Sequence, residues 1–178
     1  MTEPGPFAVV ALVVARAGLR AWLIGGHAVN TWIEPRFTSD IDLTVLADRP
    51  ALERALEELA VHGYQVVQAV GADAPSGPDF LRLAAASGPP LDIQTAKTDY
   101  QRQLVARAVA TREGLPVATA EDLVILKLIA HRPKDVVDLL SGGPRRVSVV
   151  RRSAGSRKVR ASWAIWSSRR GWSSPTTS

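Results

Sequence analysis

The sequence predicts a single α/β (α+β) domain in which helices pack on a small mixed β-sheet. Three observations lead to this fold class. Short apolar or alternating runs, typical of strands, recur at residues 22–24, 40–46, 64–70, 80–86 and 90–96. Segments with helical apolar spacing precede, separate and follow these runs. A chain of 178 residues is also an ordinary size for one domain with a proper core.

The helices follow from apolar periodicity and from signals at their ends. Residues 7–19 are apolar nearly all round with Gly18 near the end, and residues 51–63 have leucine at helical spacing and stop at Gly63. Residues 99–110 predict an amphipathic helix. Thr119, with Asp122 three residues on, resembles a capping box. The helix that follows is expected to bury Leu123, Ile125, Leu126, Ile129 and Ala130.

Two carboxylates stand close together at the start of the second strand. Side chains alternate between the faces of a strand, so Asp40, Asp42 and Thr44 are expected on one face. Neighbouring carboxylates oppose each other's ionisation unless a cation lies between them. Oxygen ligands favour a hard ion, and Mg²⁺ commonly takes one or two protein carboxylates together with substrate phosphates. The alternative is a solvated strand face.

A Gly-Gly pair precedes these carboxylates. Gly25 and Gly26 follow the short strand 22–24 and lead into a short helix at about 27–33. Residues without Cβ let backbone N–H groups approach a phosphate, and a helix N-terminus favours anions. Phosphate and metal sites are therefore expected to converge here.

A third carboxylate is expected on a later strand. Strands 80–86 and 90–96 are joined by the turn formers of residues 87–90, which predicts a hairpin. Asp92 and Gln94 share one face of the second of these strands. Asp92 is either part of the same site or an exposed strand residue.

The order strand, Gly-Gly, helix, Arg36, Ser39, Asp40-Ile41-Asp42 resembles the nucleotidyltransferase superfamily related to DNA polymerase β. The resemblance implies a polymerase β-like domain that moves a nucleoside monophosphate from an NTP to an acceptor hydroxyl, using two Mg²⁺ ions. It makes Asp92 the general base or the residue that orients the acceptor hydroxyl. The implied metal ligands are Asp40, Asp42 and Asp92, and the implied nucleotide-binding residues include Gly25, Gly26, Arg36 and Ser39.

Residues 117–140, VATAEDLVILKLIAHRPKDVVDLL, look like the C-terminal signature of small nucleotidyltransferases of the AbiEii type, the toxins of bacterial toxin–antitoxin pairs. By this resemblance, which covers residues 15–141, Lys127 contacts the triphosphate and takes part in catalysis. Arg132, Asp135 and Asp138 would order the nucleotide site. Alternatively, Lys127 reaches solvent along its apolar helix, and the two aspartates complement a helix dipole.

The acceptor is less defined than the chemistry. The AbiEii resemblance suggests a tRNA 3′ end as acceptor and an antitoxin protein as partner. Small antibiotic nucleotidyltransferases also show Gly-Gly-x-x-x-Asn ahead of Asp-x-Asp, as Gly25 to Asn30 does here, so an aminoglycoside-like or lincosamide-like acceptor is the second hypothesis. Protein nucleotidylation and a nucleotide-binding module that has lost its chemistry are further alternatives. His27 stands where many relatives have serine, and either replaces its hydroxyl or caps the helix.

Charge divides the chain into two parts. The net charge is +5, but residues 143–178 hold nine Lys or Arg and no acid, which leaves residues 1–142 with 13 basic and 17 acidic residues, a net of −4. We predict a nucleotidyltransferase domain at 1–142 and a separate tail at 143–178. The tail is a nucleic-acid arm with Trp163, Trp166 and Trp172 stacking on bases, a disordered segment, or an out-of-frame C-terminus.

The remaining composition points to a cytoplasmic protein. The chain has no cysteine, so neither disulfides nor thiolate metal sites are expected. Its apolar start lacks a basic region, has Glu3 before it and Arg16 after it, and is expected to be a buried helix rather than a signal peptide. No apolar run is long enough to predict a membrane span.

Overall fold

The computed structural model describes residues 5–112 and 114–130, which form five helices and five strands. In chain order the elements are α1 (Pro6–Arg16), β1 (Arg20–Leu23), α2 (Gly25–Trp32), β2 (Ile41–Leu46), α3 (Arg49–Val61), β3 (Tyr64–Val70), β4 (Phe80–Ala85), β5 (Leu91–Thr95), α4 (Asp99–Arg107) and α5 (Ala120–Ala130).

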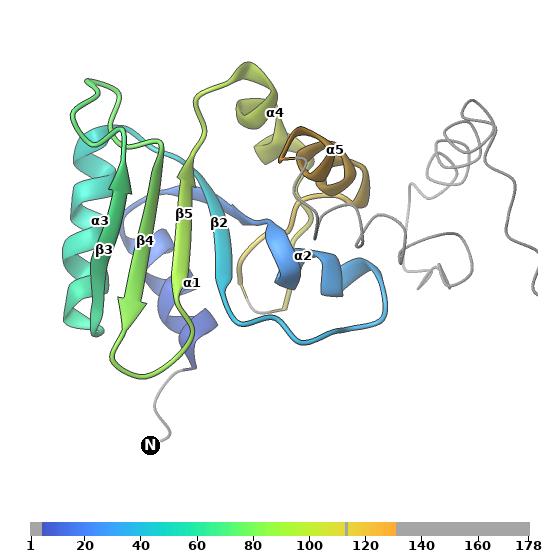
Figure 1. The fold of residues 1–178 in the computed structure, drawn as a ribbon, viewed down its shortest axis with the longest axis horizontal. Coiled ribbons are helices and arrows are strands. Elements are labelled where there is room, and N and C mark those ends of the chain that lie inside the picture. Colours follow the sequence, from blue (N-terminus) through green and yellow to red (C-terminus); the bar gives the residue numbers. More distant parts are fainter. Residues whose placement is uncertain (1–4, 113, 131–178) are drawn as a thin grey trace, which may run out of the picture.

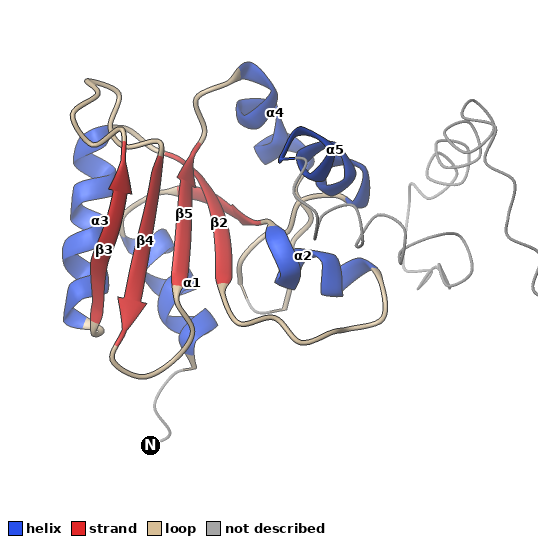
Figure 2. Ribbon diagram, viewed as in Figure 1, coloured by secondary structure: helices blue, strands red, loops and turns tan. Residues whose placement is uncertain are grey.

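The strands form one mixed sheet in the order β1-β2-β5-β4-β3. The central pair, β2 and β5, is parallel, and the other neighbours are antiparallel. Helices α1 and α3 lie behind the sheet in Figure 1, whereas α2, α4 and α5 gather at its β1 and β2 side. The coloured elements of Figure 2 show that the front of β3, β4 and β5 carries no helix. The sheet is therefore covered on one face and partly open on the other.

Alternation along the strands explains which face is covered. The side chains of Leu81, Leu83, Leu91 and Ile93 are at most 4% exposed and lie on the α1 and α3 side of the sheet. Residues between them, such as Arg82 and Asp92, point to the opposite face and are half-buried. Burial of this apolar layer is the main stabilising contribution to the domain. Because the core is complete on one face, the other face is available for polar side chains.

Local signals fix the helix starts. Pro6 occupies the first turn of α1, where its missing N–H costs nothing. Asp48 caps α3 by accepting a hydrogen bond from the Ala51 N–H at 2.8 Å. Thr98 and Gln101 form a capping box at the start of α4.

The predicted fold class is confirmed, and the strand expected at 64–70 is found with the same bounds. The hairpin of β4 and β5 is also confirmed. The helix expected at 99–110 ends at Arg107, because Val109 instead exchanges backbone hydrogen bonds with Val117. Helix α2 begins at Gly25, so the Gly-Gly pair forms its first turn rather than a separate one.

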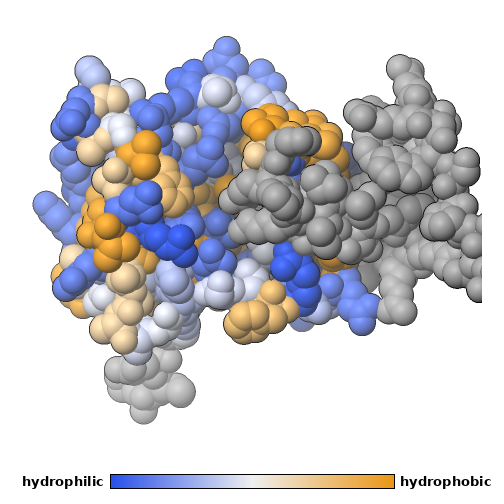
Figure 3. Space-filling model, viewed as in Figure 1, coloured by the Kyte–Doolittle hydropathy of each residue, from blue (hydrophilic) through white to orange (hydrophobic). Residues whose placement is uncertain are grey.

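The buried face expected for the helix after Thr119 is only partly found. Leu123 is buried and Leu126 packs partly buried against the core, but Ile125 and Ile129 of α5 are 40% and 69% exposed, and Ala130 is exposed as well. Figure 3 shows hydrophobic residues gathered on the surface over α5. The residue buried beside Leu123 is instead Asp122, which is 3% exposed. A charged side chain that was expected only to cap the helix is therefore buried.

Asp122 joins α4 to α5 through several hydrogen bonds. Its carboxylate accepts from Arg107 Nη2 at 2.8 Å, Arg107 Nε at 3.1 Å and the Tyr100 hydroxyl at 3.0 Å. Thr119 donates to it at 2.8 Å, and the Thr119 hydroxyl accepts from the Asp122 N–H, which confirms the predicted cap. Burial, followed by the nearby Asp122 carboxylate, raises the pKa of Tyr100 to about 12. The buried charge is thus fully provided with donors.

Replacing Asp122 with alanine is expected to lower the free energy of unfolding by about 2 kcal/mol, because several donors lose their shared acceptor. The measurement is urea denaturation followed by circular dichroism. Asp99→Ala is the matched control. The Asp99 side chain is 89% exposed, so its ion pair with Arg102 contributes little to the free energy of unfolding. Equal effects of the two substitutions would contradict this role.

Candidate active site

Three carboxylates meet on the partly open face of the sheet. Asp42 and Asp92 are directly paired across the parallel strands β2 and β5, so their side chains point the same way. Asp40 precedes β2 and joins them. One carboxylate oxygen from each residue lies within 4.8 Å of the others. The structure thus brings together the three residues that the sequence placed in a metal site.

These three residues fit a hard divalent cation. Every donor is a carboxylate oxygen, which a hard cation prefers, and the three residues are half-buried. Three carboxylates this close repel one another without a cation between them. Asp40, Asp42 and Asp92 would hold Mg²⁺ through these oxygens.

The Gly-Gly pair lies directly against the carboxylates. A Cβ built on Gly25 would lie 2.0 Å from Asp42 Oδ2, and Gly25 has a φ of +63°, in the left-handed region. A Cβ on Gly26 would lie 2.4 Å from the Thr38 hydroxyl. The Ile24 N–H donates to the Asp42 carbonyl at 2.9 Å, which fixes this turn to β2. Only glycine fits at either position without displacing a neighbour, and the backbone of the first turn of α2 therefore adjoins the acidic cluster.

The loop from α2 to β2 is held by one amide side chain. Asn30 donates to the Arg36 carbonyl at 2.7 Å and accepts from the Arg36 N–H at 3.1 Å. Ser39 donates to Asp40 Oδ1 at 3.2 Å. Ser39 is exposed and adjoins the site through this bond, whereas Arg36 is exposed and its predicted nucleotide contact stays a prediction. Asn30 has a structural role that the sequence pattern did not reveal.

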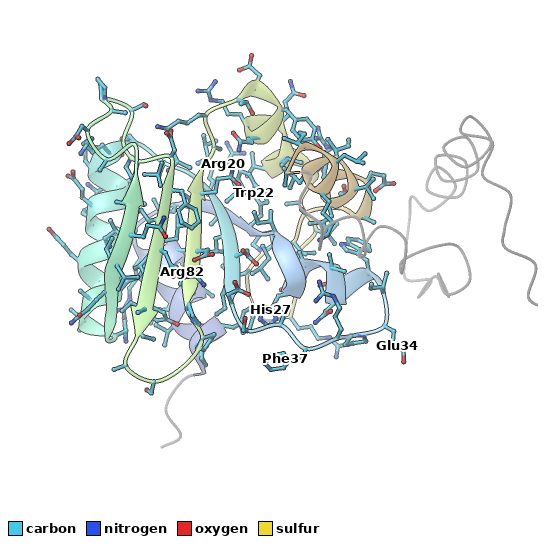
Figure 4. All side chains as sticks on the ribbon, in the orientation of Figure 1. Arg20, Trp22, His27, Glu34, Phe37 and Arg82 are labelled. Atoms are coloured by element: carbon cyan, nitrogen blue, oxygen red, sulfur yellow. The ribbon has the colours of Figure 1, made fainter. Side chains whose placement is uncertain are left out.

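His27 lies in the first turn of α2, on the α2 side of the site (Figure 4). Its ring meets the ring of Phe7 edge to face, with centroids 4.7 Å apart. Burial lowers the pKa of His27, and the Asp40 charge opposes that shift. The imidazole is therefore packed against α1 as well as lying near the carboxylates.

The remaining predicted residues are only partly described. Lys127 is half-buried on α5, and α5 packs beside α2. Arg132, Asp135 and Asp138 lie outside the described residues, as does the tail at 143–178 with its predicted boundary. Their roles stay predictions.

Sequence reasoning missed Arg82. This residue lies on β4, directly opposite Asp92 of β5, and Figure 4 shows it on the β4 side of the site. Its guanidinium lies 3.5 Å from Asp92 and 3.8 Å from Asp40. The signal was present in the pattern Leu81-Arg82-Leu83. Side chains alternate between the faces of a strand, so an arginine between two core leucines points to the face away from the core.

A known protein family matches most of this chain. The family model described as nucleotidyl transferase AbiEii toxin, type IV TA system, matches residues 8–141. The chain belongs to this family. AbiEii nucleotidyltransferases are thus confirmed as the family that the Gly-Gly, Asp-x-Asp and C-terminal patterns predicted. No functionally curated protein matches the chain.

Solved structures share the fold at low identity. The lincosamide antibiotic adenylyltransferase LnuA, bound to lincomycin, has a TM-score of 0.52 and 18% identity, covering 79% of this chain and 98% of its own. ANT(2″)-Ia with adenylyl-2″-tobramycin has a TM-score of 0.50 and 16% identity, and the match covers 90% of this chain and 94% of ANT(2″)-Ia. The polyadenylate synthase of Megavirus has a TM-score of 0.51 and 16% identity, and the match covers 96% of this chain and 39% of the synthase. The AbiEii domain thus has the nucleotidyltransferase fold. Among its described helices, none has the length and apolarity needed to cross a membrane.

Proposed function

We propose that this AbiEii domain transfers a nucleoside monophosphate from an NTP to the 3′ hydroxyl of a tRNA, with Mg²⁺ as cofactor and pyrophosphate as the leaving group. The observation that supports this reaction most is the meeting of Asp40, Asp42 and Asp92 beside the glycines of α2. Acidic ligands and a phosphate-facing backbone are the two parts that nucleotidyl transfer requires.

Each residue has a proposed task. Asp40 and Asp42 hold the cations. Asp92 takes the proton from the acceptor hydroxyl or orients it. Gly25 and Gly26 let the first turn of α2 face the triphosphate, with Lys127 of the neighbouring α5 as its cationic partner. Two bound Mg²⁺ ions would neutralise phosphate charge and assist the attacking and leaving oxygens.

The bonds that change are few. The acceptor oxygen forms a bond to the α-phosphorus of the NTP, and the bond from that phosphorus to the bridging oxygen of pyrophosphate breaks. The acceptor proton leaves to the Asp92 carboxylate, which lies on the opposite side of β2 from α2. Positioning and charge stabilisation supply most of the rate enhancement in such a transfer. An antitoxin protein is the partner that AbiEii membership suggests.

The test is transfer of label from each of the four α-³²P NTPs to total tRNA with Mg²⁺. We expect labelled tRNA with the full chain and about a thousandfold less with Asp42→Asn. Tobramycin and lincomycin serve as competing acceptors in parallel reactions, and label on either of them alone would replace tRNA with an antibiotic acceptor. NTP binding without transfer to any acceptor would instead make the domain a nucleotide-binding module.

A further inference from the structure

One row of polar side chains crosses the open face of the sheet. Asp42 of β2 is paired with Asp92 of β5, Asp92 with Arg82 of β4, and Arg82 with Gln68 of β3. Paired residues on neighbouring strands project from the same face, about 4.8 Å apart in the direction of the hydrogen bonds. Arg82 therefore stands one strand beyond the acidic cluster, on the side away from α2.

Arg82 is held near the carboxylates by charge rather than by fixed hydrogen bonds. Its Nη2 lies 3.8 Å from Asp40 Oδ2, and its Nε lies 3.5 Å from Asp92 Oδ1. Both distances exceed the usual range of a hydrogen bond. Its side chain is 41% exposed, against 13% for Asp92. A guanidinium in this arrangement can turn to an incoming anion once the carboxylates take a cation as partner.

The two sides of the acidic cluster are suited to different parts of the reaction. The glycines of α2 adjoin Asp42 on one side and present backbone for a triphosphate. Asp92 and Arg82 lie on the other side, where none of the helices in residues 5–112 and 114–130 covers the front of β4 and β3 (Figure 1). An NTP with its phosphates at α2 leaves this side for the acceptor.

The charge of this acceptor side distinguishes one class of acceptor from another. β3 and β4 contain no acidic residue, and Arg82 is their single charged one. A polycationic antibiotic needs further carboxylates around it, and beyond Asp92 the strands β4 and β3 offer only the guanidinium of Arg82. A phosphodiester, in contrast, matches the planar, forked donors of arginine.

We propose that Arg82 binds the terminal phosphodiester of an RNA acceptor and so selects an anionic acceptor over a cationic one. This inference rests on the proposed nucleotidyl transfer, because it assigns Arg82 to the acceptor side of that reaction. The neighbouring Gln68 extends the same polar row toward the β3 edge. Arg82 is thereby a specificity residue that touches the acceptor.

The first experiment measures binding without turnover. Fluorescein-labelled tRNA is titrated with the full chain, with Mg²⁺ and without NTP, and anisotropy is followed at several salt concentrations. Arg82→Gln is expected to weaken binding about tenfold and to reduce the slope of log affinity against log salt by about one. Arg82→Lys keeps the charge but lacks the forked donors of arginine. Compared with Arg82→Gln, it should restore the salt slope more fully than the tRNA affinity.

Arg16→Gln is the matched control. It removes the same charge from α1, behind the sheet, where Arg16 pairs with Glu58 and is 61% exposed. Its tRNA affinity and salt slope should equal those of the wild type. Wild-type affinity and slope in Arg82→Gln, or no tRNA binding by the wild type, would overturn the proposal.

Kinetics separate this role from a merely structural one. Arg82→Gln should raise the KM for tRNA about tenfold and leave the KM for NTP unchanged. Its Mg²⁺ affinity, measured by calorimetry without RNA, should equal or exceed that of the wild type, because a competing cation has gone. A fall in Mg²⁺ affinity would show that Arg82 only orders the carboxylates, and would overturn the proposal. If the wild type binds tRNA but transfers nothing, the proposed reaction fails while the binding result still tests Arg82.

Discussion

Replacing Asp42 with asparagine is expected to lower nucleotidyl transfer about a thousandfold without destabilising the metal-free protein. The substitution keeps the shape of the side chain but removes one of three carboxylates whose oxygens lie within 4.8 Å of one another. Loss of the charge weakens cation binding and with it the stabilisation of phosphate charge. Loss of the mutual repulsion, in contrast, favours the folded state. Activity and stability should therefore change in opposite directions.

Two measurements check this result. Initial rates of labelled tRNA formation give the loss of transfer, and thermal unfolding gives Tm with and without Mg²⁺. Mg²⁺ should raise the Tm of the wild type, because it binds only the folded state, and should raise that of Asp42→Asn much less. Asp99→Asn, at a carboxylate of α4 that is 89% exposed, should behave as wild type in both assays. A large fall in Tm of metal-free Asp42→Asn would instead make Asp42 a structural residue.

The acidic cluster could be predicted from the sequence because strand alternation is a local rule. Asp42 and Asp92 each stand in a strand between apolar residues that enter the core, so each had to face away from α1 and α3. Periodicity does not say which strands are neighbours. That β2 and β5 are adjacent and parallel, with Asp42 opposite Asp92, is a property of the sheet order, which was not predicted. The resemblance to the superfamily implied only that Asp92 belongs to the same site.

Other features depend on contacts between distant segments and could not be predicted in this way. Asp122 was expected only to cap α5, yet it is buried because Arg107 and Tyr100 of α4 supply its donors. Ile125 and Ile129 lie outside the core, against the helical pattern. Strand alternation indicates that Arg82 faces away from the core, but its position opposite Asp92 depends on the register of the hairpin.

Gly25→Ala is expected to reduce transfer by about a hundredfold or more, and it tests whether the first turn of α2 is part of the site. A Cβ at this position would lie 2.0 Å from Oδ2 and 2.5 Å from Cγ of Asp42, so the carboxylate has to move. A displacement of about 1 Å in a catalytic group can cost about a hundredfold in rate. The φ of +63° adds about 1 kcal/mol of strain for a residue with a side chain.

Gly18→Ala separates the two effects, because Gly18 has a φ of +67° and nothing within 4 Å of a Cβ. Gly18→Ala should therefore lose stability in urea denaturation through backbone strain alone, and Gly25→Ala should lose at least as much. Only Gly25→Ala should also lose transfer and Mg²⁺ affinity, measured per folded molecule. Equal activity in the two variants would mean that Asp42 accommodates a methyl group without leaving its functional position. Loss of transfer with normal Mg²⁺ affinity would instead place the effect of Gly25 on the triphosphate, which meets the same backbone turn.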